Sequence, residues 1–195
     1  MQSPDPQKWA KIREAEAERH RQNELKFAAE QRIKRNLFEN WMRPALHRMI
    51  TASGVARVGR LTYILLSVDA EGCLKRILKA AVVSAKEAKR NTIKPEDVSY
   101  KLAGYTGPFL GKKDDLFFAK ATFERSVRHY AKAIEPNIRF SPDAFPLIQK
   151  FLEAHIFTTI NLSKTAMQHA RRNTLLHRDV WLVTDSMRFC PIADK

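Results

Sequence analysis

The chain has 195 residues, 44% of them hydrophobic, and its 35 Lys and Arg against 21 Asp and Glu give a formal net charge of +14. This length suffices for one or two small cores, and the positive surplus favours a polyanion or an anionic membrane as partner without indicating a fold. No apolar run approaches the roughly 20 residues that a bilayer span requires, and residues 1–5 lack the features of a secretory signal. Cys73 and Cys190 form no Cys-x-x-Cys pair, so free thiols in a reducing compartment are expected.

Residues 1–42 are expected to form a basic helical extension. The segment Lys8–Glu39 contains no Gly or Pro and is rich in the strong helix formers Ala, Glu, Lys, Arg and Gln. An apolar stripe recurs at every fourth position: Leu25, Ala29, Ile33, Leu37 and Trp41. We expect this segment to be mostly helical and to pack through the stripe; a stripe that merely caps the adjoining core is the alternative.

Two long amphipathic helices are predicted further along, over about residues 61–88 and 143–170. Apolar residues recur there at spacings of three and four, the chain has only six glycines, and alternation typical of strands is scarce. Ser141 is a plausible N-cap of the second helix, with Pro142 as its first residue. Pro146 lies about one turn inside that helix, where it removes an amide donor, so a distorted or late start is expected.

An internal repeat relates the two long helices. Residues 88–98 (AKRNTIKPEDV) and 170–180 (ARRNTLLHRDV) are identical at six of eleven positions, 82 residues apart. The same offset places Arg139 on Arg57, and each arginine precedes a long helix. Each copy therefore has the order short helix, loop with arginine, long helix, loop with Arg-Asn-Thr, short helix.

A short linker joins the copies, because residues 104–108 (GYTGP) end the first and residues 111–115 (GKKDD) lead into the second. So short a tether favours pairing of the two halves within one chain. We define the first half as residues 43–111 and the second half as residues 112–195.

The motifs resemble those of the core histones. Residues 43–46 (RPAL), 54–58 (GVARV) and 88–92 (AKRNT), with Asp97, Val98 and Tyr100, are similar to histone H4. Residues 123–128 (FERSVR), 138–140 (IRF) and 169–172 (HARR), with Asp179, are similar to histone H3. The order resembles the histone doublets of large DNA viruses of the Marseillevirus type. The resemblance implies an all-α protein of two tandem histone folds that form one intramolecular pseudo-dimer.

The resemblance also implies a DNA-binding surface at the paired loops. Histone folds pair head to tail, so Arg57 would lie beside Thr174 and Arg139 beside Thr92. A narrow minor groove concentrates negative potential and attracts guanidinium groups without base reading. The alternative is that each arginine is an exposed loop residue that binds nothing. The presence of an arginine at equivalent positions in both copies of the repeat disfavours this alternative.

Further cations match family positions at or near phosphates: Lys89, Arg171, Arg43, Arg48, Lys120, Arg125 and Arg128. Phosphate contacts are strong and independent of base sequence, although each of these side chains could instead be merely solvated. Thr51, Ala52 and Ala56 stand where the family has basic residues, so fewer contacts are expected at the first loop.

The end of the second half is expected to join two copies of the chain about a two-fold axis. The family positions of that contact are occupied by His169, Arg172, Asp179 and Leu182, while Ala166 replaces a family cysteine, so a metal role there is doubtful.

The resemblance also implies an ion pair within each half. Arg90 and Asp97, and equally Arg172 and Asp179, stand at the spacing of an arginine–aspartate pair that clamps the family's second loop.

No phosphate-binding glycine loop, paired metal ligands or nucleophile motif occurs, so we expect neither an enzyme nor a cofactor. The predicted function is sequence-independent wrapping of double-stranded DNA into nucleosome-like particles, in the nucleus or, for a viral protein, in the virion, viral factory or host nucleus. The expected partners are DNA, a second copy, and a pair resembling the other core histones, H-two-A and H-two-B, with no membrane and no small-molecule substrate. A histone-fold scaffold subunit of a transcription or chromatin complex is the alternative; such proteins often lose the DNA-facing arginines.

Overall fold

A computed structural model describes residues 41–98 and 116–189. The chain divides into residues 1–40 and 41–195, and the second unit is described below. The predicted helix over Lys8–Glu39, the linker of residues 104–115, Tyr100 and Cys190 lie outside the described residues.

The first described element is a helical segment, residues 41–52, which leads into the first half and whose buried side chains recur at helical spacing. The buried positions are Met42, Ala45, Leu46, Met49 and Ile50. Gly54 follows with a φ of +79°, a backbone conformation that glycine adopts without strain. The remaining elements are β1 (Arg57–Val58), α2 (Arg60–Glu87), β2 (Thr92–Ile93) and the 3-10 turn η1 (Pro95–Asp97).

The second half repeats this order with a short helix, a long helix and a further helix. Its elements are α3 (Lys120–Ile134), β3 (Arg139–Phe140), α4 (Ala144–His169), β4 (Thr174–Leu175) and α5 (His177–Phe189). The strands are two residues long, so the described part of the chain is mostly helical, as the sequence predicts. The repeat extends to the backbone: Lys89 and Arg171, 82 residues apart, have positive φ values of 53° and 52° just after the two long helices.

The start of α4 corrects one prediction. Ser141 does not cap the helix; its carbonyl accepts a hydrogen bond from the amide of Ala144, the first helical residue, and Asp143 occupies the N-cap. The late start places Pro146 third in the helix, within the first turn. Amides there have no intrahelical partner, so the missing N–H of proline removes no helical bond.

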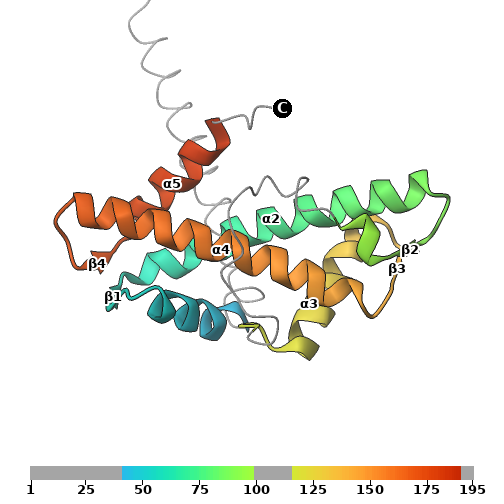
Figure 1. Ribbon diagram of the computed structural model, residues 1–195, viewed down its shortest axis with the longest axis horizontal. Helices are drawn as coiled ribbons and strands as arrows, with labels where there is room; N and C mark the ends of the chain where they lie inside the picture. The colour runs from blue at the N-terminus through green and yellow to red at the C-terminus, as the bar shows by residue number, and fades with distance from the viewer. Residues whose placement is uncertain (1–40, 99–115, 190–195) are drawn as a thin grey trace, which may run out of the picture. The chain divides into compact units, whose positions relative to one another are not determined.

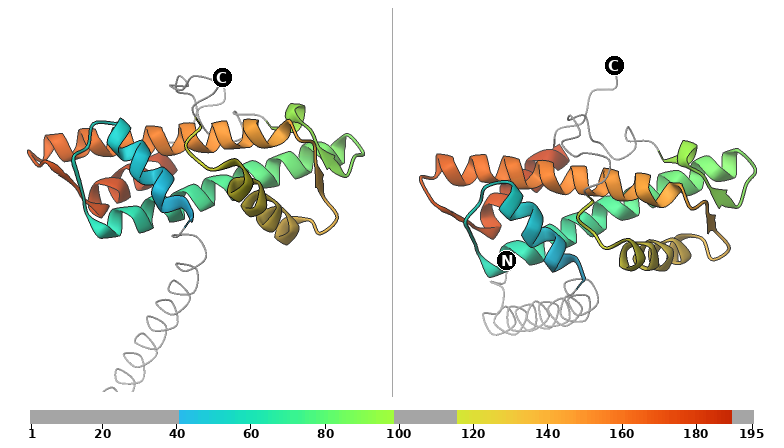
Figure 2. Two further views of the ribbon diagram at one scale, coloured as in Figure 1. Left: turned by 90° about the horizontal axis from the view of Figure 1, so that it is seen from below. Right: turned by 60° about the horizontal axis from the view of Figure 1, so that its bottom comes forward.

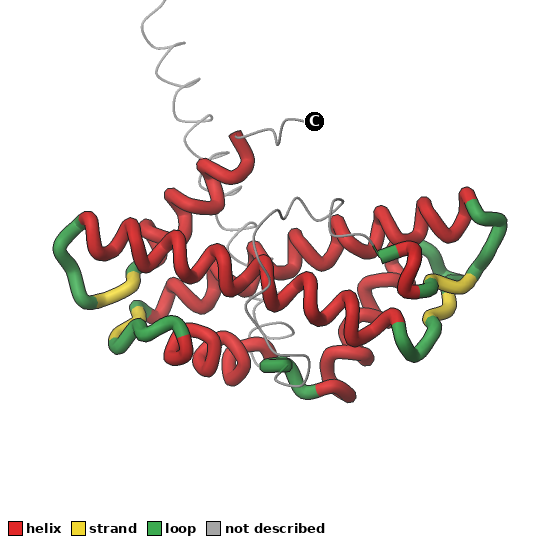
Figure 3. The backbone as a smooth tube through the Cα atoms, in the orientation of Figure 1, coloured by secondary structure: helices red, strands yellow, loops and turns green. Residues whose placement is uncertain are grey.

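The two long helices, α2 and α4, lie side by side and cross, and each half contributes one of them (Figures 1 and 2). At one end β1 pairs in parallel with β4, and at the other β2 pairs in parallel with β3 (Figure 3). Both ladders therefore join a loop of the first half to a loop of the second. Burial of apolar side chains from both long helices forms the core, including Leu66, Leu74, Leu78, Ile148, Leu152 and Ile156.

Aromatic rings close the core where the two shorter helical segments approach. The ring centroids of Trp41 and Phe118 are 5.2 Å apart, and those of Phe118 and Phe123 are 5.9 Å apart. Buried Glu153 of α4 holds the residues just before α3 in place. Its Oε1 accepts hydrogen bonds of 2.9 Å from the amides of both Phe117 and Phe118. Burial raises the pKa of Glu153, and hydrogen bonds from Gln149 and these two amides act against that rise.

Candidate nucleic-acid interface

The structure brings together both predicted arginine–threonine pairs. Arg57 is the direct ladder partner of Thr174, and Arg139 is the direct ladder partner of Thr92. Both arginines are exposed and both threonines are half-buried. Each end of the crossed helices thus presents one exposed guanidinium beside one threonine.

Hydrogen bonds between the halves hold each loop pair in place. At one end the amide of Gly59 donates to the carbonyl of Leu175 at 2.8 Å, and the hydroxyl of Thr62 donates to the same carbonyl at 3.1 Å. At the other end the amide of Arg139 donates to the carbonyl of Asn91 at 2.9 Å. The arginine positions are therefore fixed by backbone bonds rather than by the arginine side chains.

Each threonine-bearing loop is clamped by an arginine–aspartate pair, as the resemblance to the core histones implies. Arg90 donates two hydrogen bonds to Asp97, each 3.0 Å long, and a third to the carbonyl of Thr92 at 3.1 Å. Arg172 binds Asp179 through both of its terminal nitrogens in the same way and also donates to the carbonyl of Thr174. These bonds connect each clamp directly to the threonine beside the opposing arginine.

The buried aspartates are held in the charged form. Burial raises the pKa of Asp97, but hydrogen bonds from Arg90, the amide of Lys94 and Ser84 outweigh this, so the pKa lies below its ordinary value. For Asp179, burial is likewise outweighed, here by Arg172 and the amide of Leu176. An aspartate whose pKa is lower in the folded protein than in the unfolded chain stabilises the fold at neutral pH. That stabilisation is lost as the pH falls through the pKa of the folded protein.

Replacing either clamp carboxylate should destabilise the fold at neutral pH. We expect Asp97→Asn and Asp179→Asn each to lower the free energy of unfolding by about 2 kcal/mol at neutral pH, because charge-assisted hydrogen bonds from a guanidinium are lost. Urea unfolding at pH 7 and in acid measures the effect, which should shrink as the pH falls below about 4, because the carboxylates take up protons first in the unfolded chain and, at lower pH, in the folded protein. Asp143→Asn, at an exposed aspartate, is the control and should change little. Equal losses in all three variants would refute the clamp's role.

Several of the predicted phosphate-binding cations lie close to the loops or on the short helical segments. Lys89 and Arg171 are exposed at the turns that follow α2 and α4. Arg43 is exposed on residues 41–52 with its guanidinium carbon 5.3 Å from the ring centroid of Tyr63. Arg48, also exposed, donates a hydrogen bond to the carbonyl of Phe117, so part of its bonding capacity is used within the chain.

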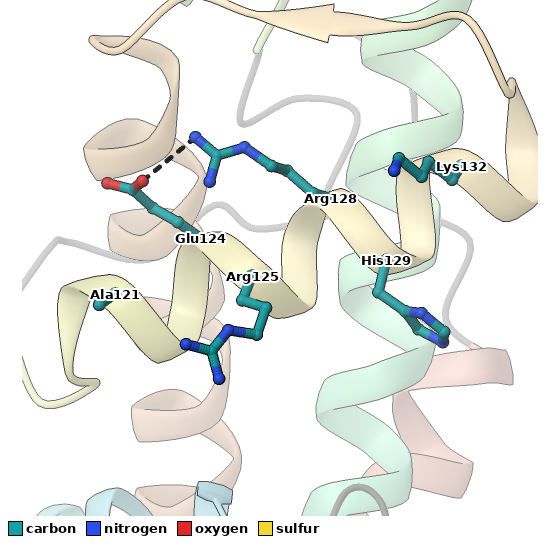
Figure 4. A pocket seen from close by; sticks show the side chains of 6 residues that line it. All are labelled: Ala121, Glu124, Arg125, Arg128, His129 and Lys132. Atoms are coloured by element: carbon teal, nitrogen blue, oxygen red, sulfur yellow. Dashed lines mark hydrogen bonds and ion pairs between the residues drawn. The ribbon is translucent and has the colours of Figure 1, made fainter.

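The other predicted cations lie on α3, where the surface is hollowed (Figure 4). Lys120 is exposed as the first residue of the helix. Arg125, Arg128 and Lys132 line the hollow with Ala121, Glu124 and His129. Arg128 donates to Glu124 at 3.3 Å and lies 4.6 Å from the ring centroid of Phe145. The sequence analysis missed Lys132, although its spacing from Arg125 and Arg128 puts it on the same helical face.

The predicted self-association residues separate into two groups. Asp179 is buried and engaged with Arg172 inside the chain, whereas His169 and Leu182 are exposed, Leu182 to 53%. Trp181, which the sequence analysis missed, is 57% exposed next to Leu182 on α5. Two large apolar side chains thus face solvent at the end predicted to join two copies.

Over the described residues, no group of three or more His, Cys, Asp or Glu side chains is placed to hold a metal ion. In the same part of the chain, no helix is both long and apolar enough to cross a membrane.

Crossed long helices flanked by short ones, with loops paired at both ends, define a histone fold. Residues 111–185 match the family model of the core histone domain, which covers the histones H-two-A, H-two-B, H3 and H4. The structure is also similar to the crystal structure of the histone from Methanopyrus kandleri, with a TM-score of 0.51 and 19% sequence identity over 71% of this chain and 89% of that one. At this identity the likeness shows the fold alone. The chain therefore contains a histone-fold domain.

Proposed function

We propose that this chain is a fused core histone, an H4-like half followed by an H3-like half, that wraps double-stranded DNA without sequence preference. The observation that carries the proposal is the repeated site: an exposed arginine beside a half-buried threonine at each end of one pair of crossed helices. Guanidinium groups on a rigid backbone suit successive minor grooves that face a curved protein surface. The net charge of +14 supplies the attraction that is independent of sequence.

Pairing of the two halves within one chain is supported by the contacts between them. Both strand ladders run between the halves. Lys164 of α4 donates a 2.7 Å hydrogen bond to the carbonyl of Ser53 in the first half. In addition, the likeness to the Methanopyrus kandleri histone extends over 71% of this chain, more than either half alone could supply.

Salt titration of binding to unrelated DNA duplexes tests the function. A packaging protein should bind all of them alike, and the logarithm of its affinity should fall steeply with the logarithm of salt concentration. Nuclease digestion of DNA reconstituted with the chain, alone and with a complementary histone pair, should then leave a discrete protected length. Weak binding with a shallow salt dependence would favour a scaffold subunit instead.

Cutting the linker should leave the halves together. With a protease site introduced within residues 104–115, we expect both fragments to co-elute in high salt after cleavage, because the core and both ladders are shared between them. Size-exclusion chromatography with light scattering measures this. Two fragments that separate and remain folded would contradict intramolecular pairing.

Assembly into particles would require further partners. We infer that a second copy of the chain joins through α5 and that a complementary histone pair completes the particle.

The location that corresponds to this function is the nucleus, or the virion, viral factory and host nucleus for a viral protein. Imaging of the chain together with DNA in the producing cell tests this.

A further inference from the structure

A buried polar cluster lies where α2 and α4 face each other. Nε2 of His155 in α4 is 2.8 Å from Oδ2 of Asp69 in α2, and the two side chains are only 10% and 14% exposed. Cys73, one turn beyond Asp69, is a free and fully buried thiol that is hydrogen-bonded to the same imidazole. The cluster therefore joins one half of the chain to the other inside the core.

The imidazole in this cluster carries a charge at neutral pH. Burial lowers the pKa of His155, but hydrogen bonds to Asp69 and Cys73 outweigh it and raise the pKa to about 10. A positive imidazole thus faces a carboxylate in an environment shielded from water. A buried ion pair of this kind adds little net stability, because the cost of removing both charges from water offsets most of their attraction. Net stabilisation of the fold therefore does not account for its presence.

The cluster breaks the symmetry between the halves. Positions 82 residues apart are equivalent in the repeat, so His155 corresponds to Cys73, and Phe151 corresponds to Asp69. Each long helix therefore presents a different set of side chains at the crossing. Only the pairing of α2 with α4 gives the carboxylate a cation.

Pairing of each half with its own kind from another chain would leave these charges without partners. Two first halves would place each Asp69 against the other chain's Cys73, with two buried carboxylates and no cation. Two second halves would place each His155 near a second His155 and Phe151, with no carboxylate. Removing one partner of a buried ion pair is strongly destabilising, and both arrangements would incur that loss.

We propose that Asp69 and His155 determine which helices pair, so that the first half takes the second half as its partner and rejects a second copy of itself. The selection acts against pairing of like halves from different chains, a hazard for two similar folds in one polypeptide. It rests on the intramolecular pairing proposed above but not on DNA wrapping. The DNA-binding titration of the wild type is therefore independent of its outcome.

Cys73 supplies a direct readout of wrong pairing. In a pair of two first halves, the equivalence of positions 73 and 155 would bring the two Cys73 thiols face to face near the symmetry axis. In a Cys190→Ser background Cys73 is the only cysteine. The chain is refolded from denaturant at high protein concentration in high salt without DNA and then exposed to a mild oxidant. Covalent dimer, measured on a non-reducing gel, reports pairing of first halves.

The test variant is Asp69→Leu with His155→Leu, which makes the crossing apolar in every pairing. We expect it to fold, since apolar replacement of a buried ion pair is commonly tolerated, while the Cys73-linked dimer rises about ten-fold over wild type. Asp69→Asn keeps the side-chain shape and should also raise the dimer; it decides the question if the double variant does not fold. Glu135→Gln is the matched control, because it removes the exposed ion pair that Lys86 makes with the other half.

The proposal predicts dimer at the wild-type level in the Glu135→Gln control. Folded Asp69 variants with cross-linking no higher than wild type would overturn it. An equal rise in the control would overturn it as well, because loss of any ion pair between the halves would then suffice.

Discussion

Replacing Arg57 and Arg139 together by alanine should weaken DNA binding about ten-fold for each arginine lost, corresponding to about 1.4 kcal/mol apiece. Both side chains are exposed and lie on the paired loops, so each can enter a groove without any change in the fold. The salt dependence should become shallower by about one unit for each cation removed. Fluorescence anisotropy of labelled duplexes over a range of salt concentrations measures both quantities.

The control loses the same two charges elsewhere. Arg76→Ala with Lys79→Ala removes exposed cations from the middle of α2, away from both ladders. We expect this variant to lose less affinity and to leave the nuclease protection pattern unchanged, whereas the Arg57/Arg139 variant should expose new cleavage sites. Equal losses in both double variants would mean that only total charge matters, and the paired-loop site would be wrong. Unfolding in urea should be the same for both, because surface substitutions change stability little.

The paired-loop site could be predicted from the sequence because the repeat relates its two arginines and the resemblance to core histones implies how the halves pair. The offset between Arg57 and Arg139, combined with head-to-tail pairing, is enough to assign Thr174 and Thr92 as neighbours. The clamps follow from the same resemblance, because Arg90 and Asp97 stand at the spacing of the ion pair that clamps the second loop of core histones. Both features recur in the second half, so each prediction is supported twice.

The cluster at the crossing could not be predicted in this way. Asp69 and His155 are 86 residues apart, and the repeat gives no sign of them because their equivalent positions hold different residue types. Only the crossing of α2 and α4 brings them together. Ser141 misled the prediction of the α4 start for a different reason: two prolines follow it closely, and the helix begins where the second falls in the first turn.

The solvent exposure of Trp181 on α5 was likewise beyond the sequence pattern, whereas the resemblance to core histones placed Leu182 at a contact between copies. Trp181 and Leu182 are adjacent in the chain, and a large apolar residue in a helix is more often buried than exposed. The structure shows that α5 buries Val180 and Val183 instead, which leaves Trp181 and Leu182 facing solvent. A contact between two copies through α5, as proposed, would cover both side chains.

Leu182→Arg should abolish the two-chain state of the protein. If two copies join about a two-fold axis through α5, Leu182 meets an apolar side chain of the second copy, and an arginine there would bury an unpaired charge against its symmetry mate. We expect the dissociation constant of the two-chain species to rise at least about a hundred-fold, or roughly 3 kcal/mol. Analytical ultracentrifugation in high salt without DNA measures the molar mass of both proteins across a concentration series.

Leu61→Arg is the matched control for this experiment. Leu61 is 52% exposed against 53% for Leu182, and it lies at the start of α2 beside the β1–β4 loop pair rather than on α5. The same substitution at equal exposure should therefore leave the two-chain species intact. If wild type is a single chain at micromolar concentration with or without DNA, the end of the second half is only solvated and the predicted contact is wrong. Dissociation by both variants would instead show that added charge, not the α5 surface, separates the copies, since repulsion between like net charges opposes association wherever the charge is placed.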